Sequence, residues 1–289
     1  MDASVTFADG TTQYIYVTGL PTSADWAEKK ANILIPANAV SITIYGLLYS
    51  VGELTTDDYS FKDIGDVMGF NRGIVSLTFD DSLVSHYQPT LPLMQQYGMK
   101  GTFYITTETI DQAWGMSSGQ ILAHVAAGNE IGGHTISHAH LTTLASGALH
   151  NELSTSKTVL ESLIGSPVTS FASPYGEYST TTVNAIKNYY QSHRSTDDGF
   201  NSKDGFDPYN IVVQNITVGL PLSTIKGWID KAKTDKTWLV LVYHDIMDNG
   251  DLYSATPADF EAILAYLQST GVSVQTLSDA LAEVQSQLP

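Results

Sequence analysis

The chain has 289 residues, which exceeds a typical single domain and leaves room for one large domain and a small one. Its 30 acidic and 13 basic residues give a formal net charge of −17, which disfavours nucleic acid and anionic membrane surfaces because both require clustered Lys and Arg. The chain has no Cys, so disulfides and thiolate metal sites are excluded and any metal must be held by His and carboxylate side chains.

Residues 1–70 are predicted to form a small β-rich unit. Apolar and β-branched residues alternate over 13–18, 32–35 and 40–48, and Gly, Pro and Asn interrupt these stretches. Glycines recur over 64–72, which places the boundary of the unit there.

From residue 73 onward the pattern changes to apolar runs that alternate with helical segments, which predicts βα units in a mainly parallel sheet or barrel over residues 71–289. The predicted strands are 73–79, 101–105, 129–133, 168–172, 211–218, 238–243 and 273–276. The predicted helices are 120–127, 149–164, 181–190, 224–233 and 257–270, the last with Thr256 as N-cap and Pro257 at its first position. No stretch is long and apolar enough to predict a membrane span.

Polar side chains with catalytic potential follow four of these strands. Asp80 and Asp81 follow the first, and His134, Tyr175 and His244 each follow another. The carboxyl ends of parallel strands form one face of a barrel, and catalytic sites are built on that face.

Two short motifs, one that ends in Asp80 and Asp81 and one that begins at His134 and ends at His138, together indicate a metal site with a spare carboxylate. One Asp with His134 and His138 would give a divalent ion three ligands and leave a position open, which is typical of catalytic metals. Taken alone, an Asp-Asp pair is a common turn element and two His four residues apart are often incidental. Their occurrence together favours the metal site.

At these motifs the chain resembles the NodB-homology polysaccharide deacetylases, carbohydrate esterase family four, over about residues 73–281. The family's Thr-Phe-Asp-Asp motif is present at residues 78–81, and its His-Thr/Ser-x-x-His motif is present at 134–138. The resemblance implies a distorted, seven-stranded β/α barrel in which Asp80 is the catalytic base and Asp81, His134 and His138 hold the metal. Consecutive side chains after a strand point in different directions, which agrees with separate roles for the two Asp residues.

The third family motif, Arg-x-Pro-Tyr, departs from its pattern here. Pro174 and Tyr175 match, but Ala172 replaces the Arg that pairs with the catalytic base in the family. By resemblance, the backbone N–H of Tyr175 helps to bind the oxyanion. Arg194, one of two arginines in the chain and predicted to follow a helix, is our candidate replacement. Asp197 and Asp198 are loose candidates for the family's fourth motif, an Asp that tunes the catalytic acid.

The fifth family motif, Leu-x-x-His, is present at residues 241–244. The resemblance implies that His244 is the general acid and that Leu241 lines a pocket for the acetyl methyl group, although a His beside Asp245 and a buried Leu are also ordinary structural features. His140 is excluded from the ligand set because the motif does not use it. His86, His124 and His150 are interpreted as structural, and His193 is left unassigned.

The N-terminal unit is weakly similar, over residues 26–62, to the latter half of a jelly-roll carbohydrate-binding module. Aromatic rings can stack on sugars, but aromatic residues in strands more often belong to a core, so both interpretations stay open. The candidate aromatic residues are Tyr14, Tyr16, Trp26, Tyr45 and Tyr49.

The resemblance predicts a metal-dependent hydrolase that removes N-acetyl groups from N-acetylglucosamine units of chitin, peptidoglycan or a related polymer. The expected cofactor is one divalent ion, with zinc first and cobalt or nickel as alternatives. The alternatives are an O-acetyl xylan esterase and a non-catalytic carbohydrate-binding protein on the same barrel. We expect a monomer that is secreted or displayed on the cell surface, with acetylated polysaccharide as its partner.

Overall fold

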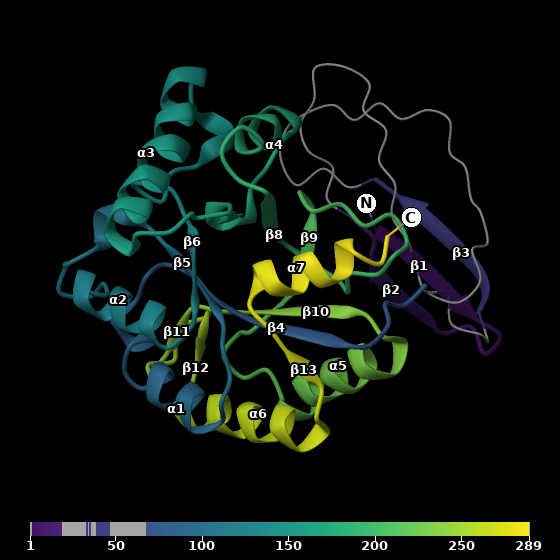
Figure 1. Ribbon diagram of the computed structural model, residues 1–289. Coiled ribbons are helices and arrows are strands. Elements are labelled where there is room, and N and C mark those ends of the chain that lie inside the picture. The colour runs from purple at the N-terminus through teal and green to yellow at the C-terminus, as the bar shows by residue number, and fades with distance from the viewer. Residues whose placement is uncertain (1, 19–32, 34, 36–38, 47–67, 289) are drawn as a thin grey trace. The chain divides into compact units, whose positions relative to one another are not determined.

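The computed structural model describes residues 2–18, 33, 35, 39–46 and 68–288 (Figure 1). The chain divides into two compact units, Met1–Val67 and Met68–Pro289. Among the residues described, no helix has both the length and the apolar composition needed to cross a bilayer.

The described part of the first unit is a three-stranded antiparallel sheet. Strand β1 (Asp2–Phe7) lies between β2 (Thr12–Tyr16) and β3 (Ala39–Tyr45). Ala3 and Val5 alternate along β1 and are fully buried. The sequence pattern predicted the second and third strands to within a few residues but missed β1. Two of the four residues of its predicted strand at 32–35 fall outside the described residues.

Seven parallel strands of the second unit close into a barrel, as predicted. Strand β10 pairs with β4 along its whole length, from Trp238 beside Ile74 to Tyr243 beside Phe79, and this pairing closes the barrel. A short eighth strand, β13 (Ser273–Val274), pairs only with the start of β4. The barrel strands in spatial order are β4 (Ile74–Phe79), β5 (Thr102–Ile105), β6 (Glu130–Gly133), β7 (Ser170–Ala172), β8 (Ser192–Asp198), β9 (Ile211–Asn215) and β10 (Trp238–Tyr243).

Helices follow the strands and cover the outside of the barrel (Figure 1). Thr256 caps α6 by accepting a hydrogen bond from the backbone N–H of Asp259, as its sequence position predicted. Helices α1 and α7 were not predicted. The helices are α1 (Thr90–Gln96), α2 (Ser118–Ala126), α3 (Ser146–Ile164), α4 (Thr180–Ile186), α5 (Leu222–Asp235), α6 (Pro257–Thr270) and α7 (Leu277–Gln285).

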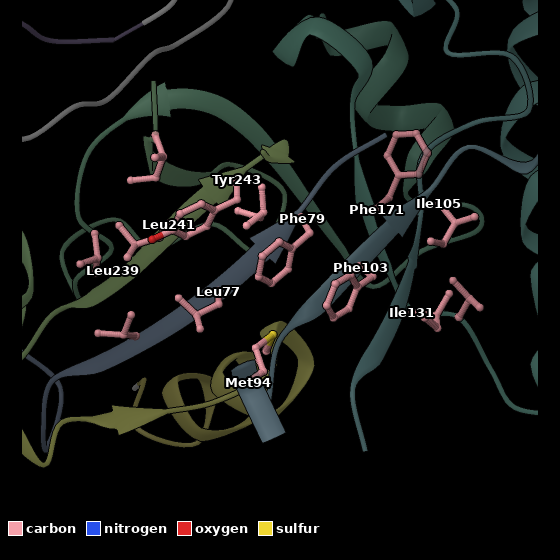
Figure 2. Packing of buried hydrophobic residues seen from close by; sticks show 14 of the residues in the cluster. Leu77, Phe79, Met94, Phe103, Ile105, Ile131, Phe171, Leu239, Leu241 and Tyr243 are labelled. Atoms are coloured by element: carbon pink, nitrogen blue, oxygen red, sulfur yellow. The ribbon is translucent and has the colours of Figure 1, made fainter. Parts of the chain in front are cut away.

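The barrel has an outer and an inner core because side chains alternate between the two faces of each strand. Leu77, Phe79 and Phe103 belong to the outer core beneath the helices (Figure 2). The inner core contains Ile74 and Trp238, the first residues of their strands, together with buried residues of α7. Helix α7 therefore closes the end of the barrel at which the strands begin.

The main error in the predicted topology concerns β8, Ser192–Asp198. Its sequence, SHRSTDD, has no apolar residue, yet its first four residues are buried. A strand whose buried residues are polar has no hydrophobic pattern to detect. The prediction counted 273–276 as the seventh strand and placed Arg194 after a helix, whereas Arg194 lies within a barrel strand.

Candidate active site

The structure brings the strand-end residues together at the carboxyl face of the barrel. Asp80 follows β4, His134 follows β6 and His244 follows β10. Tyr175 belongs to a 3-10 turn, Pro174–Gly176, directly beyond β7. Barrel closure thus turns separate sequence motifs into one cluster.

Asp81, His134 and His138 direct three ligand atoms toward one point. The three atoms lie within 4.8 Å of one another, the one such group within the described residues. Asp81 Oδ1 is 3.3 Å from His134 Nε2 and 3.1 Å from His138 Nε2. Burial alone would raise the pKa of Asp81, but its contacts with the two imidazoles lower it, so the carboxylate is ionised.

The bonding of these side chains fits a divalent cation. His134 Nδ1 lies 2.8 Å from the carbonyl oxygen of Ala172 and must donate its hydrogen there, which leaves the lone pair on Nε2, the atom facing Asp81. Despite its short contacts, Asp81 Oδ1 is buried and makes no hydrogen bond of acceptable geometry. An oxygen and imidazole nitrogens with available lone pairs suit zinc, cobalt or nickel.

Asp80 is held by a buried guanidinium. Arg194 Nη2 donates hydrogen bonds of 2.6 and 2.5 Å to the two carboxylate oxygens of Asp80, and both side chains are almost completely excluded from solvent. Burial raises the pKa of Asp80, but the neighbouring groups, first the guanidinium of Arg194, outweigh that effect and leave the pKa below its ordinary value.

Strand register explains how Arg194 reaches Asp80. Ala172 on β7 and Arg194 on β8 are paired residues in adjacent strands. The guanidinium therefore enters the barrel at the level of Ala172, but from the next strand. Its carbon lies 5.0 Å from the centre of the Tyr104 ring, a cation–π contact within the inner core.

His244 completes the group around Asp80. Its Nε2 lies 3.9 Å from Asp80 Oδ2, and its side chain is 20% exposed. The ring of Tyr253 lies beside it, with centroids 5.0 Å apart. A partly exposed imidazole at this place can exchange a proton with a bound molecule.

Tyr175 has a left-handed backbone, with φ of 58° and ψ of 6°. Its ring is exposed, stacks on His140 at 3.9 Å and meets the ring of His138 edge-on at 4.5 Å. His140 is also 3.1 Å from Glu177, so it contacts the metal-site loops without belonging to the ligand group.

Unfavourable backbone conformations concentrate at this cluster. Within the described residues, seven non-glycine residues have positive φ, and five of them lie in the strand-end turns: Asp81, Ser82, Thr135, His138 and Tyr175. Such conformations persist only where the surrounding structure enforces them, and they are frequent at functional sites.

Leu241 is not part of the cluster, which corrects its predicted place in an acetyl pocket. It is fully buried in the outer core beside Leu77 and Tyr243 (Figure 2), because alternation along β10 turns it away from the barrel interior. Val242 instead faces inward with the inner core.

The remaining tuning candidates are bonded elsewhere. Asp197 accepts a hydrogen bond from Tyr178 and Asp198 accepts one from Asn215, and neither bond leads to His244. Burial raises the pKa of Asp198. Pro174 is buried in the turn before Tyr175.

Glu152 stabilises the metal-site loop through contacts that no sequence pattern predicted. From α3 its carboxylate accepts hydrogen bonds from the backbone N–H groups of Ile136 and Ser137 and from the Ser137 hydroxyl. No local motif marks a contact between residues so far apart in sequence.

Comparisons with known proteins confirm the predicted resemblance. Residues 69–191 match the family model named polysaccharide deacetylase. YxkH of Bacillus subtilis (strain 168), whose name assigns it to the polysaccharide deacetylases, is 28% identical over 160 residues, which is 55% of this chain and 57% of that protein. A chitin deacetylase of Pestalotiopsis sp is 31% identical over 100 residues, which is 35% of this chain and 33% of that enzyme. The matched regions thus span only part of each relative.

A solved structure agrees with the barrel fold. The Xyl-CE4 domain of a multidomain xylanase from the hindgut metagenome of Trinervitermes trinervoides has a TM-score of 0.53 and 19% identity, and the match covers 74% of this chain and 92% of that domain.

Proposed function

We propose that the chain is a metal-dependent deacetylase that hydrolyses the acetamido group of N-acetylglucosamine units in a polysaccharide and releases acetate. The observation that carries this proposal is the buried Asp80–Arg194 pair beside the Asp81-His134-His138 group. This arrangement offers a base, a cation site and, in His244, an acid within one cluster.

Asp81, His134 and His138 would hold the ion, with zinc as the first choice. When bound, a divalent ion polarises the acetyl carbonyl and makes water more acidic. Asp80 accepts the proton of the attacking water, and Arg194 keeps that carboxylate in place.

The backbone N–H of Tyr175 donates to the oxygen that becomes negative as the carbonyl carbon turns tetrahedral. His244 then gives its proton to the departing nitrogen, the C–N bond breaks, and acetate and a free amino sugar leave. An amine is a poor leaving group without this proton, so the acid matters more for an amide than for an ester.

The net charge of the chain and the names of its relatives support this substrate class. A chain of net charge −17 favours neutral or cationic polymers, and acetylated and deacetylated aminoglycans fit that description. Chitin deacetylases among the relatives support the N-acetyl substrate. The same residues could attack an O-acetyl ester, so acetylated xylan is the competing substrate.

The test is acetate release from an N-acetylglucosamine oligomer and from acetylated xylan, measured in parallel. Chelator-treated protein, the same protein with zinc or cobalt restored, and Asp80→Asn are compared. We expect metal-dependent release from the oligomer that Asp80→Asn abolishes. Faster release from xylan would assign the esterase function, and sugar binding without release from either polymer would indicate a binding protein.

We also propose that the N-terminal unit contributes to polysaccharide binding and that the protein acts outside the cytoplasm. Tyr14 and Tyr16 lie two residues apart on β2, so they share one face, and they are 76% and 44% exposed. Exposed neighbouring rings suit the apolar face of a sugar. Reduced retention of Tyr14→Ala/Tyr16→Ala on insoluble chitin, with unchanged turnover of a soluble oligomer, would support this role.

A further inference from the structure

The turn that follows the metal-site Asp contacts the turn that carries His244. His86 is the last residue of a 3-10 helix, Val84–His86, and its Nε2 lies 2.6 Å from the backbone carbonyl oxygen of His244. The two residues are 158 positions apart in sequence. A carbonyl oxygen only accepts hydrogen bonds, so His86 Nε2 carries the hydrogen and donates it.

The His86 ring is fixed in place by its surroundings. The side chain has no solvent exposure, and its ring centroid lies 5.6 Å from that of Phe79 and 5.8 Å from that of Phe103. Burial lowers the pKa of His86 to about 4, so the ring is neutral near pH 7. Its Nδ1 is buried without a hydrogen-bond partner, so the contact with His244 is the polar interaction that fixes the ring.

Neighbouring hydrogen bonds hold the same segment. The N–H of Ile246 donates to Ser85 Oγ at 3.3 Å, and the N–H of Asp80 donates to the carbonyl of Tyr243 at 3.0 Å. The chain that carries His244 is thus tied to the β4 strand end and its following turn at Tyr243, His244 and Ile246. His86 makes the bond to the central residue.

We propose that His86 is a positioning residue for the general acid, because its hydrogen bond to the His244 carbonyl fixes the backbone from which the His244 ring reaches the leaving nitrogen. This inference rests on the proposed function of His244. A displacement of about 1 Å at a reacting group can lower a rate about 100-fold, so loss of this bond has a measurable effect.

The experiment compares His86→Leu, His86→Gln and His124→Leu with the wild type. Gln can place an amide N–H near the position of His Nε2, whereas Leu has no donor. His124 is the matched control because it is also fully buried and contacts the ring of Phe103, but its ring is hydrogen-bonded to Asn129 and not to the segment that carries His244. Each protein is assayed on an N-acetylglucosamine oligomer and on 4-nitrophenyl acetate, an ester whose leaving group departs without general-acid help.

We expect His86→Leu to lower kcat on the amide 10- to 100-fold while turnover of the ester changes less than about threefold. His86→Gln should recover much of the amide activity, and His124→Leu should leave the ratio of the two activities unchanged. An equal loss on both substrates in His86→Leu would show a merely structural role and would overturn the proposal.

Imidazole NMR spectra of the same proteins provide a readout that needs no turnover. We expect His86→Leu to displace the His244 ring signals and His124→Leu to leave them in place. Unchanged His244 signals in His86→Leu would refute the positioning role. If the wild type releases no acetate from any amide, the proposed function fails, whereas the spectra still decide whether His86 fixes His244.

Discussion

Arg194 donates two hydrogen bonds from one guanidinium nitrogen to both carboxylate oxygens of Asp80, inside the barrel and out of contact with solvent. The Arg sits beside Ala172 in strand register, the position at which the family motif places its own Arg. The chain therefore supplies a guanidinium to Asp80 from the neighbouring strand.

Removal of this guanidinium should lower the deacetylase activity without loss of the bound metal. We expect Arg194→Ala to lower kcat at least about 100-fold, because Asp80 loses the group that orients it, and to lower the free energy of unfolding by about 3–5 kcal/mol, because a buried charge loses its partner. Turnover, metal content and urea unfolding are measured together.

The double variant Ala172→Arg/Arg194→Ala is the matched test of position. It moves the guanidinium to the preceding strand and leaves space for the new side chain. We therefore expect its kcat to be at least about tenfold higher than that of Arg194→Ala. Unchanged turnover in Arg194→Ala with metal bound would rule out the proposed replacement.

Metal binding should depend on His138 and not on His140. We expect wild-type protein to bind one zinc ion and, at free zinc 100 times Kd, to gain about 2.7 kcal/mol of stability. His138→Ala should lose most of this gain, since one of three ligands is missing, whereas His140→Ala should keep it. Calorimetric titration and thermal unfolding with and without zinc make the comparison. Wild-type zinc affinity in His138→Ala would contradict the ligand assignment.

The turn that presents the Tyr175 N–H should not tolerate a side chain at Gly176. Gly176 has φ of +67°, and a Cβ there would overlap the Thr196 side chain. We expect Gly176→Ala to displace the turn, lower kcat about tenfold or more and leave zinc binding intact. Gly147→Ala, in the first turn of α3 with nothing within 4 Å of the new Cβ, is the control and should have wild-type activity. Equal activity of the two variants would argue against an oxyanion role for this turn.

Stability should fall as pH decreases from about 6.5 toward 4. Burial lowers the pKa of His193 to about 4, and it lowers those of His86 and His124 to about 4 and about 3. In this range the three histidines are protonated in the unfolded chain but stay neutral in the folded chain. Each of them therefore lowers the free energy of unfolding by roughly 1 kcal/mol for each unit by which the pH falls. Burial would lower the pKa of His134, but Asp81 raises it above its ordinary value, so its contribution to stability is already fully present below about pH 6.5 and does not offset this fall.

A variant at His193 would measure the contribution of one histidine to this dependence of stability on pH. Its Nδ1 donates to the carbonyl of Tyr209 at 2.9 Å and its Nε2 accepts from Ser173 at 2.8 Å, so the neutral ring is fully bonded. His193→Asn should flatten the dependence of unfolding free energy on pH by roughly 1 kcal/mol per unit between pH 6.5 and 5. An identical slope in urea titrations of wild type and variant would show that this ring does not contribute.

Short contiguous motifs were enough to predict the barrel and its candidate metal group. Apolar runs such as β4 and β10 identify strands, and the residues immediately after them must lie at the carboxyl end of the barrel whatever the details of packing. One Asp could therefore be grouped with His134 and His138 from the sequence pattern, and the family resemblance implied that this Asp is Asp81. The structure places the ligand atoms of these three residues together.

Tertiary structure alone decided the features that depend on closure and register. The polar strand β8 has no hydrophobic pattern, Leu241 faces the outer core because of its place in the alternation along β10, and Arg194 meets Asp80 across 114 positions of sequence. The sequence made Arg194 a candidate partner of Asp80, but the two side chains come into contact only when the seven strands close into a barrel. The physical reason is that local patterns specify which segments form strands, whereas the side chains that meet inside a barrel are set by the hydrogen-bond register between strands that are distant in sequence.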